Sequence, residues 1–135
     1  LGMDTTEVTL QMFAQADLLA FQNKYAEAIA KLDSIKILFP EHSLDDDVLY
    51  TKAQIYRKLR KTDEMISMYN TIIEKFPTEI KADNAIYELA ELYETKLNEP
   101  EKAKVLYEKI FTDYSASTFA FEARQRFRKL RGDEL

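Results

Sequence analysis

Apolar residues recur along the chain at intervals of three and four positions, and short polar breaks separate the runs. In three segments an alanine stands four residues after one apolar residue and three before another. The three sets are Met12, Ala16 and Leu19; Leu49, Ala53 and Tyr56; and Ile86, Ala90 and Tyr93. This spacing puts the members of each set on one face of an α-helix. The pattern predicts amphipathic helices whose small central alanine lets a second helix approach closely.

Polar breaks and prolines divide the chain into seven predicted helices. Pro40 and Pro77 end helices because the residue before a proline avoids helical geometry, whereas Pro100 suits the first turn of a helix. We expect Ser43 or Asp45 to cap the third helix. The expected ranges are 5–22, 25–38, 44–59, 62–75, 79–96, 100–113 and 117–131.

The predicted helices form repeating pairs. Pro40, Pro77 and Ser115 close three similar segments at intervals of 37 and then 38 residues, and this alignment brings the three alanines into register. Such an internal period predicts an all-α repeat domain. We expect a single domain over residues 1–135, with repeats at about 9–40, 46–77 and 83–115 and an unpaired helix at about 117–131.

The unpaired last helix has a strongly basic outer face, which suits the cap that a stack of repeats requires. Its cations are Arg124, Arg126, Arg128, Lys129 and Arg131. At the other end, the opening Leu1-Gly2-Met3 is not a native start, so we expect the chain to be a piece of a longer protein. Loss of a preceding repeat would leave Val8 and Leu18 partly uncovered, which predicts weak self-association through the N-terminal edge.

Two of the repeats resemble the tetratricopeptide family. The segments that carry the resemblance are Leu49-x-x-Lys52-Ala53-x-x-Tyr56 and Ile86-x-x-Leu89-Ala90-x-x-Tyr93, although alanine replaces the usual glycine and no tryptophan is present. The resemblance implies a right-handed superhelix of three helix pairs plus a C-terminal capping helix. It also implies a concave face lined by the first helix of each pair, on which a protein or peptide binds.

The long repeat unit is similar to that of bacterial cell-envelope members of this family. These are of the Tol–Pal periplasmic protein and outer-membrane assembly lipoprotein type. They share the spacing Phe-Pro-x-x-x-x-Ala-Asp-x-Ala-x-Tyr, which here begins at Phe76 and ends at Tyr87. This similarity implies a periplasmic or cell-envelope location, with the cytoplasm as the alternative.

Composition excludes several function classes. The net charge of −5 argues against a broad nucleic-acid surface, and the absence of cysteine removes disulfides and thiolate chemistry. No run of about 18 apolar residues is present, so direct membrane insertion is not expected. With only two glycines, a phosphate-cradling loop is not expected either.

The sequence predicts no enzyme, no cofactor and no metal site. His42 is the only histidine and lies at no recognisable spacing from a nucleophile, so we interpret it as a solvated loop residue. The run Asp45-Asp46-Asp47 lacks the alternation and central glycine of a calcium loop. Three acidic residues in a first helical turn are instead favoured by the helix dipole, and we expect them to be solvated.

The resemblance places partner-binding residues on the first helices and on the cap. They are Phe13, Asp17, Phe21, Tyr50, Gln54, Arg57, Tyr87, Glu91, Glu94 and Gln125. Phe13, Tyr50 and Tyr87 recur at intervals of 37 residues. These three rings either anchor a peptide or only pack against the next repeat. Glu91 and Glu94 form, with Glu88 and Asp83 of the same helix, either an acidic patch on the binding face or an ordinary solvated face. Their charge favours a neutral or basic, partly apolar ligand over an acidic one.

Two functions remain open at this point. The first is a non-catalytic protein-interaction scaffold in a cell-envelope assembly. The alternative is an oligomerisation or spacer module of a larger protein, whose groove holds no ligand. A binder requires aromatic side chains with exposed edges, whereas a spacer would bury them between helices.

Overall fold

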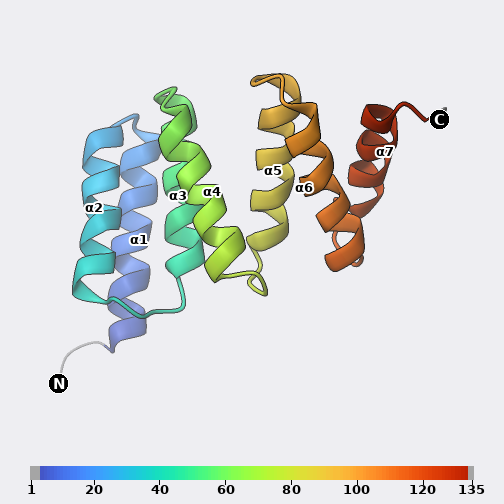
Figure 1. Cartoon of the computed structure of the whole chain (residues 1–135). Helices are drawn as coiled ribbons and strands as arrows, with labels where there is room; N and C mark the ends of the chain where they lie inside the picture. The colour runs from blue at the N-terminus through green and yellow to red at the C-terminus, as the bar shows by residue number, and fades with distance from the viewer. Residues whose placement is uncertain (1–3, 134–135) are drawn as a thin grey trace. The chain divides into compact units, whose positions relative to one another are not determined.

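The computed structural model describes residues 4–133, and each regular element in that range is an α-helix. Figure 1 shows the helices in chain order. They are α1 (Thr5–Phe21), α2 (Tyr25–Leu38), α3 (Asp45–Lys58), α4 (Thr62–Lys75), α5 (Ala82–Thr95), α6 (Pro100–Asp113) and α7 (Ala120–Arg131). The all-α class and the pairing of helices are confirmed. Within residues 4–133, no helix combines the length and apolar character needed to cross a membrane.

The chain divides into two compact units, Leu1–Thr71 and Ile72–Leu135. In the N-terminal unit α1 packs on α2, and both contact α3. In the C-terminal unit α6 packs between α5 and α7 (Figure 1). The buried core of the first unit contains Ala16, Ala28, Leu32, Ile35, Val48 and Ile55, and that of the second contains Ile86, Tyr87, Ala90, Ala103, Tyr107, Ile110 and Ala123.

The three register alanines are fully buried, as the sequence predicts. Ala16, Ala53 and Ala90 each have no exposed surface. Ala16 belongs to the same core cluster as Ala28 of the paired helix, and Ala90 belongs to the same cluster as Ala103. A small residue is needed at these positions because a larger side chain would push the paired helices apart.

The turns inside the pairs share one backbone device. Asn23, Arg60 and Asn98 adopt the left-handed conformation, with φ values of 63°, 58° and 52°. Each follows the last turn of a first helix, where a left-handed residue lets backbone N–H groups reach the free carbonyls. The α5–α6 turn, residues 96–99, is one residue longer than the turns at 22–24 and 59–61. This extra residue accounts for the change of interval from 37 to 38.

Two helices of the C-terminal unit begin three residues later than predicted. Residues 76–82 form two successive tight turns, in which Glu79 N–H donates to the Phe76 carbonyl (3.2 Å) and Ala82 N–H to the Glu79 carbonyl (3.1 Å). The same arrangement recurs before α7, where Ser117 and Ala120 are the donors. These bonds satisfy backbone groups locally, so α5 and α7 begin only after the second turn.

The loop before α3 differs from expectation because its histidine is buried. The His42 side chain is only 4% exposed, so its interpretation as a solvated loop residue was wrong. His42 Nδ1 accepts a hydrogen bond from Leu44 N–H (3.0 Å), and Nε2 lies 3.1 Å from Asp45 Oδ1. Leu44 occupies the N-cap position without a side-chain cap, which also corrects the predicted Ser43 or Asp45 cap.

The acidic first turn of α3 is only partly solvated. Asp46 is 4% exposed, contrary to the expectation that the three aspartates face solvent. The free N–H groups and the dipole of a helix N-terminus favour a carboxylate there. Asp45 also contacts Lys36 of α2 (3.5 Å), so one aspartate ties the loop to the preceding helix.

Candidate functional site

In the N-terminal unit, three predicted binding residues lie on one face of α1 at four-residue intervals. Phe13 is half-buried and packs against the core. Asp17 is exposed, yet partial burial of its carboxyl raises its pKa above the ordinary aspartate value. Phe21, at the end of the helix, is 86% exposed. This face therefore runs from an anchored ring, past a carboxylate, to a ring that is almost entirely in solvent.

On α3, two predicted residues converge on a tyrosine of α4. Gln54 Nε2 and Arg57 Nη2 donate hydrogen bonds to the Tyr69 hydroxyl over 3.2 and 2.9 Å. Tyr69 is fully buried, whereas Arg57 is exposed. Tyr50, one turn before Gln54, is half-buried. The polar end of a buried ring thus fixes two side chains on the solvent side of α3.

In the C-terminal unit, Tyr87 belongs to the core. It is 9% exposed and stacks on Phe119, with ring centroids 4.6 Å apart and an interplanar angle of 16°. Its ring also meets Tyr107 edge to face at 5.8 Å. Burial raises the pKa of the Tyr87 hydroxyl, an effect that nearby Arg126 opposes. The structure therefore assigns Tyr87 a packing role, whereas Phe13 and Tyr50 at the same repeat position keep part of their surface exposed.

Glu91 and Glu94 meet an arginine of α7. Arg126 Nη1 lies 2.8 Å from Glu94 Oε1, and its Nη2 lies 3.9 Å from Glu91 Oε2. The Tyr107 hydroxyl donates to the same Glu94 oxygen over 2.7 Å. Burial and the hydrogen bond to Glu94 both raise the pKa of Tyr107. This network joins α5, α6 and α7 and neutralises much of the acidic face.

The remaining predicted residue, Gln125, is half-buried on α7. Four residues that contact the predicted residues were not predicted as part of the site. They are Tyr69, Tyr107, Phe119 and Arg126. The two tyrosines occupy one position of the repeat, 38 residues apart, and that recurrence could have drawn attention to them. Arg126 is one of several neighbouring cations, and no local pattern distinguishes it.

Two loop contacts tie successive repeats within the C-terminal unit. The Tyr114 hydroxyl donates to the Pro77 carbonyl over 2.5 Å, and the Ser117 hydroxyl to Asp83 Oδ2 over 2.6 Å. Both bonds join the two tight-turn segments. They fix the start of α5 relative to the start of α7, and hence the position of Glu91 and Glu94 relative to Arg126.

Within residues 4–133, His, Asp and Glu side chains form no group of three or more suited to holding a metal ion. The polar clusters consist of hydrogen bonds and ion pairs that link neighbouring helices. These contacts hold charged and aromatic side chains in place on the helical framework.

Comparison with family profiles gives a match to the tetratricopeptide repeat over residues 47–78 and 84–117. Among solved structures, the chain is similar to a tetratricopeptide repeat protein from Parabacteroides merdae ATCC 43184, with 22% sequence identity and a TM-score of 0.71. The alignment covers 92% of this chain and 46% of that one, so the chain spans about half the length of its structural relative. Comparison with curated protein sequences gives no match.

The profile match covers the two helix pairs in which the sequence pattern was clearest, and the structural likeness extends the same fold over nearly the whole chain. Residues 47–78 and 84–117 are therefore two tetratricopeptide repeats.

Proposed function

We propose that this chain is a non-catalytic scaffold that binds a protein or peptide segment along the first helix of its repeats. Tetratricopeptide repeats generally mediate protein–protein interactions, and two of them are present here. The faces of α1 and α3, both in the N-terminal unit, supply the contacts. The N-terminal unit provides the aromatic surface of this proposal, because the equivalent ring of the C-terminal unit, Tyr87, lies in the core.

The observation that carries the proposal is the face of α1. Phe21 is 86% exposed and shares that face with Asp17 and half-buried Phe13. An aromatic side chain gains a large apolar contact at low entropic cost, which is why such residues dominate binding interfaces. A neighbouring carboxylate on the same face supplies orientation and a preference for positive charge.

The proposed ligand is a neutral or basic, partly apolar segment. Asp17 would attract a cation of the ligand, and Phe13 and Phe21 would contact its apolar side chains. We further propose that this activity belongs to a bacterial cell-envelope assembly in the periplasm, and the support for this is the repeat spacing shared with envelope members. Fractionation of the source cells tests this location, and recovery with the cytoplasmic fraction would contradict it.

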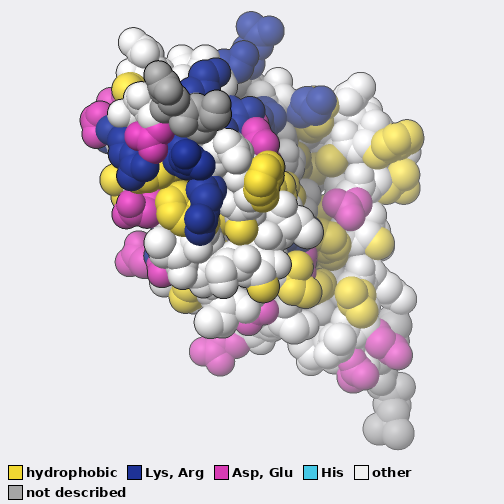
Figure 2. Space-filling view, turned by 90° about the vertical axis from the view of Figure 1, so that its right-hand side faces the viewer, with side chains coloured by type: hydrophobic (Ala, Val, Ile, Leu, Met, Phe, Trp, Pro, Cys, Tyr) yellow, Lys and Arg dark blue, Asp and Glu magenta, His cyan; other side chains and the backbone are white. Residues whose placement is uncertain are grey.

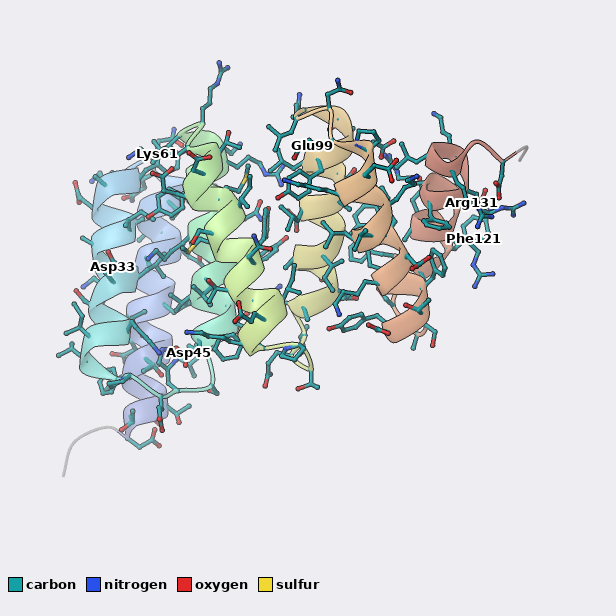
Figure 3. All side chains as sticks on the ribbon, viewed as in Figure 1. Asp33, Asp45, Lys61, Glu99, Phe121 and Arg131 are labelled. Atoms are coloured by element: carbon teal, nitrogen blue, oxygen red, sulfur yellow. The ribbon has the colours of Figure 1, made fainter. Side chains whose placement is uncertain are left out.

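Peptide display with a library of neutral and basic sequences, followed by affinity measurement, tests the binding face. Phe21→Ala should weaken the binding of a selected peptide by about thirtyfold, since truncation of an anchor residue costs about 2 kcal/mol of binding free energy. Phe121→Ala is the matched control, because Phe121 of α7 is 73% exposed and lies outside the proposed face (Figure 3). Both rings are largely in solvent, so both variants should fold normally. Equal affinities of the two variants would contradict the proposal.

A second candidate function is self-association through the N-terminal edge. Of the two residues predicted to be partly uncovered, Leu18 is 55% exposed and Val8 is half-buried, and Leu10 of the same helix is 49% exposed. Sedimentation equilibrium tests this candidate. Dimerisation that Leu18→Ser abolishes would favour the oligomerisation role, whereas a monomer that binds peptides would favour the scaffold.

A further inference from the structure

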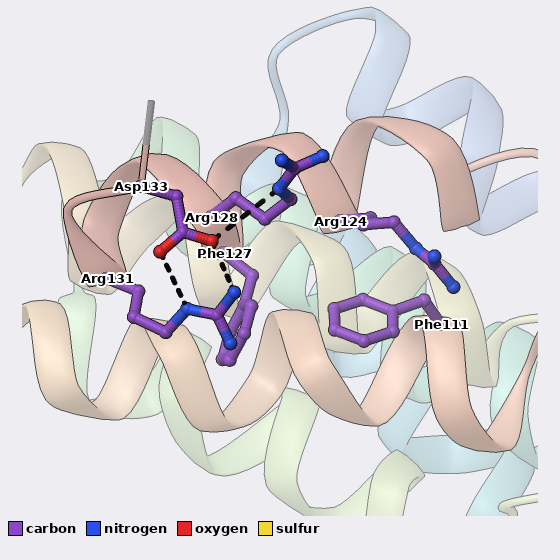
Figure 4. Close-up of a pocket in the computed structure, with 6 residues that line it drawn as sticks. All are labelled: Phe111, Arg124, Phe127, Arg128, Arg131 and Asp133. Atoms are coloured by element: carbon purple, nitrogen blue, oxygen red, sulfur yellow. Dashed lines mark hydrogen bonds and ion pairs between the residues drawn. The ribbon is translucent and has the colours of Figure 1, made fainter. Parts of the chain in front are cut away.

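The C-terminal unit carries a second surface, on the α6 and α7 side, that is distinct from the first-helix faces. Phe111 of α6 and Phe127 of α7 meet edge to face, with ring centroids 5.3 Å apart. The two rings form the floor of a pocket of about 370 Å³. Its other lining residues are Arg124, Arg128, Arg131 and Asp133. Figure 4 shows these six side chains, and Figure 2 shows basic and apolar side chains gathered on the same end of the molecule.

The arginines are held over aromatic rings. The Arg124 guanidinium lies 5.1 Å from the Phe111 ring centroid, and that of Arg131 lies 5.0 Å from the Phe127 centroid. Stacking on a ring face limits the motion of a guanidinium while its N–H groups remain free to point outward. The pocket therefore combines an apolar floor with positioned hydrogen-bond donors.

A carboxylate already occupies part of this pocket. Asp133 accepts hydrogen bonds from Arg131, one of them donated by Nε–H to Oδ1 over 3.0 Å, and Asp133 Oδ2 lies 3.6 Å from Arg128 Nε. Figure 4 shows both arginines directed at this carboxylate. This contact shows that a carboxylate is the kind of group that these arginines bind. Arg124 lies beside this pair as a third cation of the pocket, and its guanidinium is held over the Phe111 ring.

The pocket is one section of a longer stripe. Phe121, Arg124, Arg128 and Arg131 follow one another at intervals of three and four residues, which places them on one face of α7. Phe121 is 73% exposed at the start of the stripe. The lining residues carry three positive charges and one negative charge, although the chain as a whole has a net charge of −5.

From these contacts we propose that the α7 stripe and its pocket bind an acidic, partly apolar segment of a partner protein. A carboxylate of that segment pairs with Arg124 and displaces Asp133 from Arg128, and an apolar side chain contacts Phe121. A short acidic segment fits better than a nucleic acid, because the basic surface is confined to one pocket and one stripe. Nucleic acid binding requires several phosphate contacts, and the net negative charge of the chain opposes the approach of a polyanion.

The test is fluorescence anisotropy of the full chain with a labelled, terminally blocked peptide in which glutamates flank a phenylalanine. The same peptide with glutamines is the control ligand. Arg124→Gln should weaken binding by about tenfold, the loss expected for a hydrogen bond between charged groups. Lys129→Gln is the matched control, since it removes the same charge from an exposed position of α7 outside the pocket and should change binding less than about twofold.

Asp133→Asn distinguishes this pocket from general charge attraction. If the carboxylate of Asp133 competes with the ligand, its removal should tighten binding of the acidic peptide severalfold, and the glutamine peptide should not respond. Equal effects of Arg124→Gln and Lys129→Gln would overturn the proposal, as would equal binding of the two peptides. Tighter binding of a single-stranded oligonucleotide through Arg124 would also overturn it. Phe21→Ala should leave this binding intact, so failure here is separable from failure of the first-helix face.

Discussion

The two units pack equivalent tyrosines in the same way, but the first-helix residue that bonds to each hydroxyl has opposite charge in the two units. Tyr69 and Tyr107 occupy one position of the repeat, and both are fully buried. The Tyr69 hydroxyl accepts a hydrogen bond from Arg57 over 2.9 Å, whereas the Tyr107 hydroxyl donates one to Glu94 over 2.7 Å. A hydroxyl can do either, so the same buried ring accommodates a cation of the first helix in one repeat and an anion of the first helix in the next.

The first repeat shows a third solution. Leu32 stands at the position of these tyrosines and is fully buried without any polar end. Ala20 stands where Arg57 and Glu94 lie in the later repeats. The repeat therefore fixes the backbone and the buried volume, while one residue of the first helix places an apolar, a positive or a negative side chain at this position. This arrangement allows the charge beside the buried ring to change from repeat to repeat without a change of fold.

The largest expected effect on the free energy of unfolding concerns one position of the second helix. Met65 holds this position in the N-terminal unit, and Ala103 holds it in the C-terminal unit. Both are buried. Met65→Ala leaves a cavity and should reduce the free energy of unfolding by about 2–5 kcal/mol. Ala103→Met overpacks the contact with Ala90 and should cost about 1–3 kcal/mol.

Urea denaturation of both single variants measures these costs. Each spacing is adapted to its own residue, so both changes should destabilise. A stabilising effect of either substitution would show that the helix spacing in the two repeats is interchangeable.

Much of this framework was readable in the sequence. The 3.6-residue period reports burial directly, so it located all seven helices between residues 4 and 133 and the buried alanines. The late starts of α5 and α7 were missed because tight turns made by backbone bonds leave no mark on side-chain type. The stacking of Tyr87 on Phe119 was missed because the second ring comes from a loop 32 residues later. Selection of Arg126 among its basic neighbours required the tertiary register.

The tyrosine hydroxyls provide the next largest test. Tyr107→Phe removes a hydrogen bond to a charged partner in a part-buried network and should cost about 1.5–3 kcal/mol. Tyr69→Phe should cost about 1 kcal/mol or less, because exposed Arg57 can turn to water instead. Each substitution keeps the aromatic ring and removes only the hydroxyl. The difference between the two losses of stability therefore reports the hydrogen bonds of the hydroxyl groups alone. Thermal and urea denaturation at neutral pH measure it, and equal losses would contradict the contrast between the units.

Alkaline titration sharpens this test for the C-terminal unit. Burial and the bond to Glu94 hold the pKa of Tyr107 above that of an unfolded tyrosine. The unfolded chain therefore loses this proton first, and the stability that the group contributes is present below about pH 10 and falls as pH rises further. Tyr107→Phe should flatten this alkaline decline. An unchanged slope in the variant would mean that another group causes the loss.

The smallest expected effect lies in the turns that close the helix pairs. Asn98 and Arg60 both adopt positive φ at equivalent positions, but asparagine tolerates this conformation better than arginine. Arg60→Asn should therefore stabilise the chain by less than about 1 kcal/mol. The substitution also removes a cation near a helix C-terminus, where positive charge is favourable.

Arg60→Gln is the matched control, because it removes the same charge without the asparagine preference for the left-handed region. The stability of Arg60→Asn minus that of Arg60→Gln, measured by urea denaturation, gives the conformational contribution alone. If the two variants are equally stable, the left-handed turn imposes no measurable strain on residue 60, and the choice of asparagine at residues 23 and 98 has another cause.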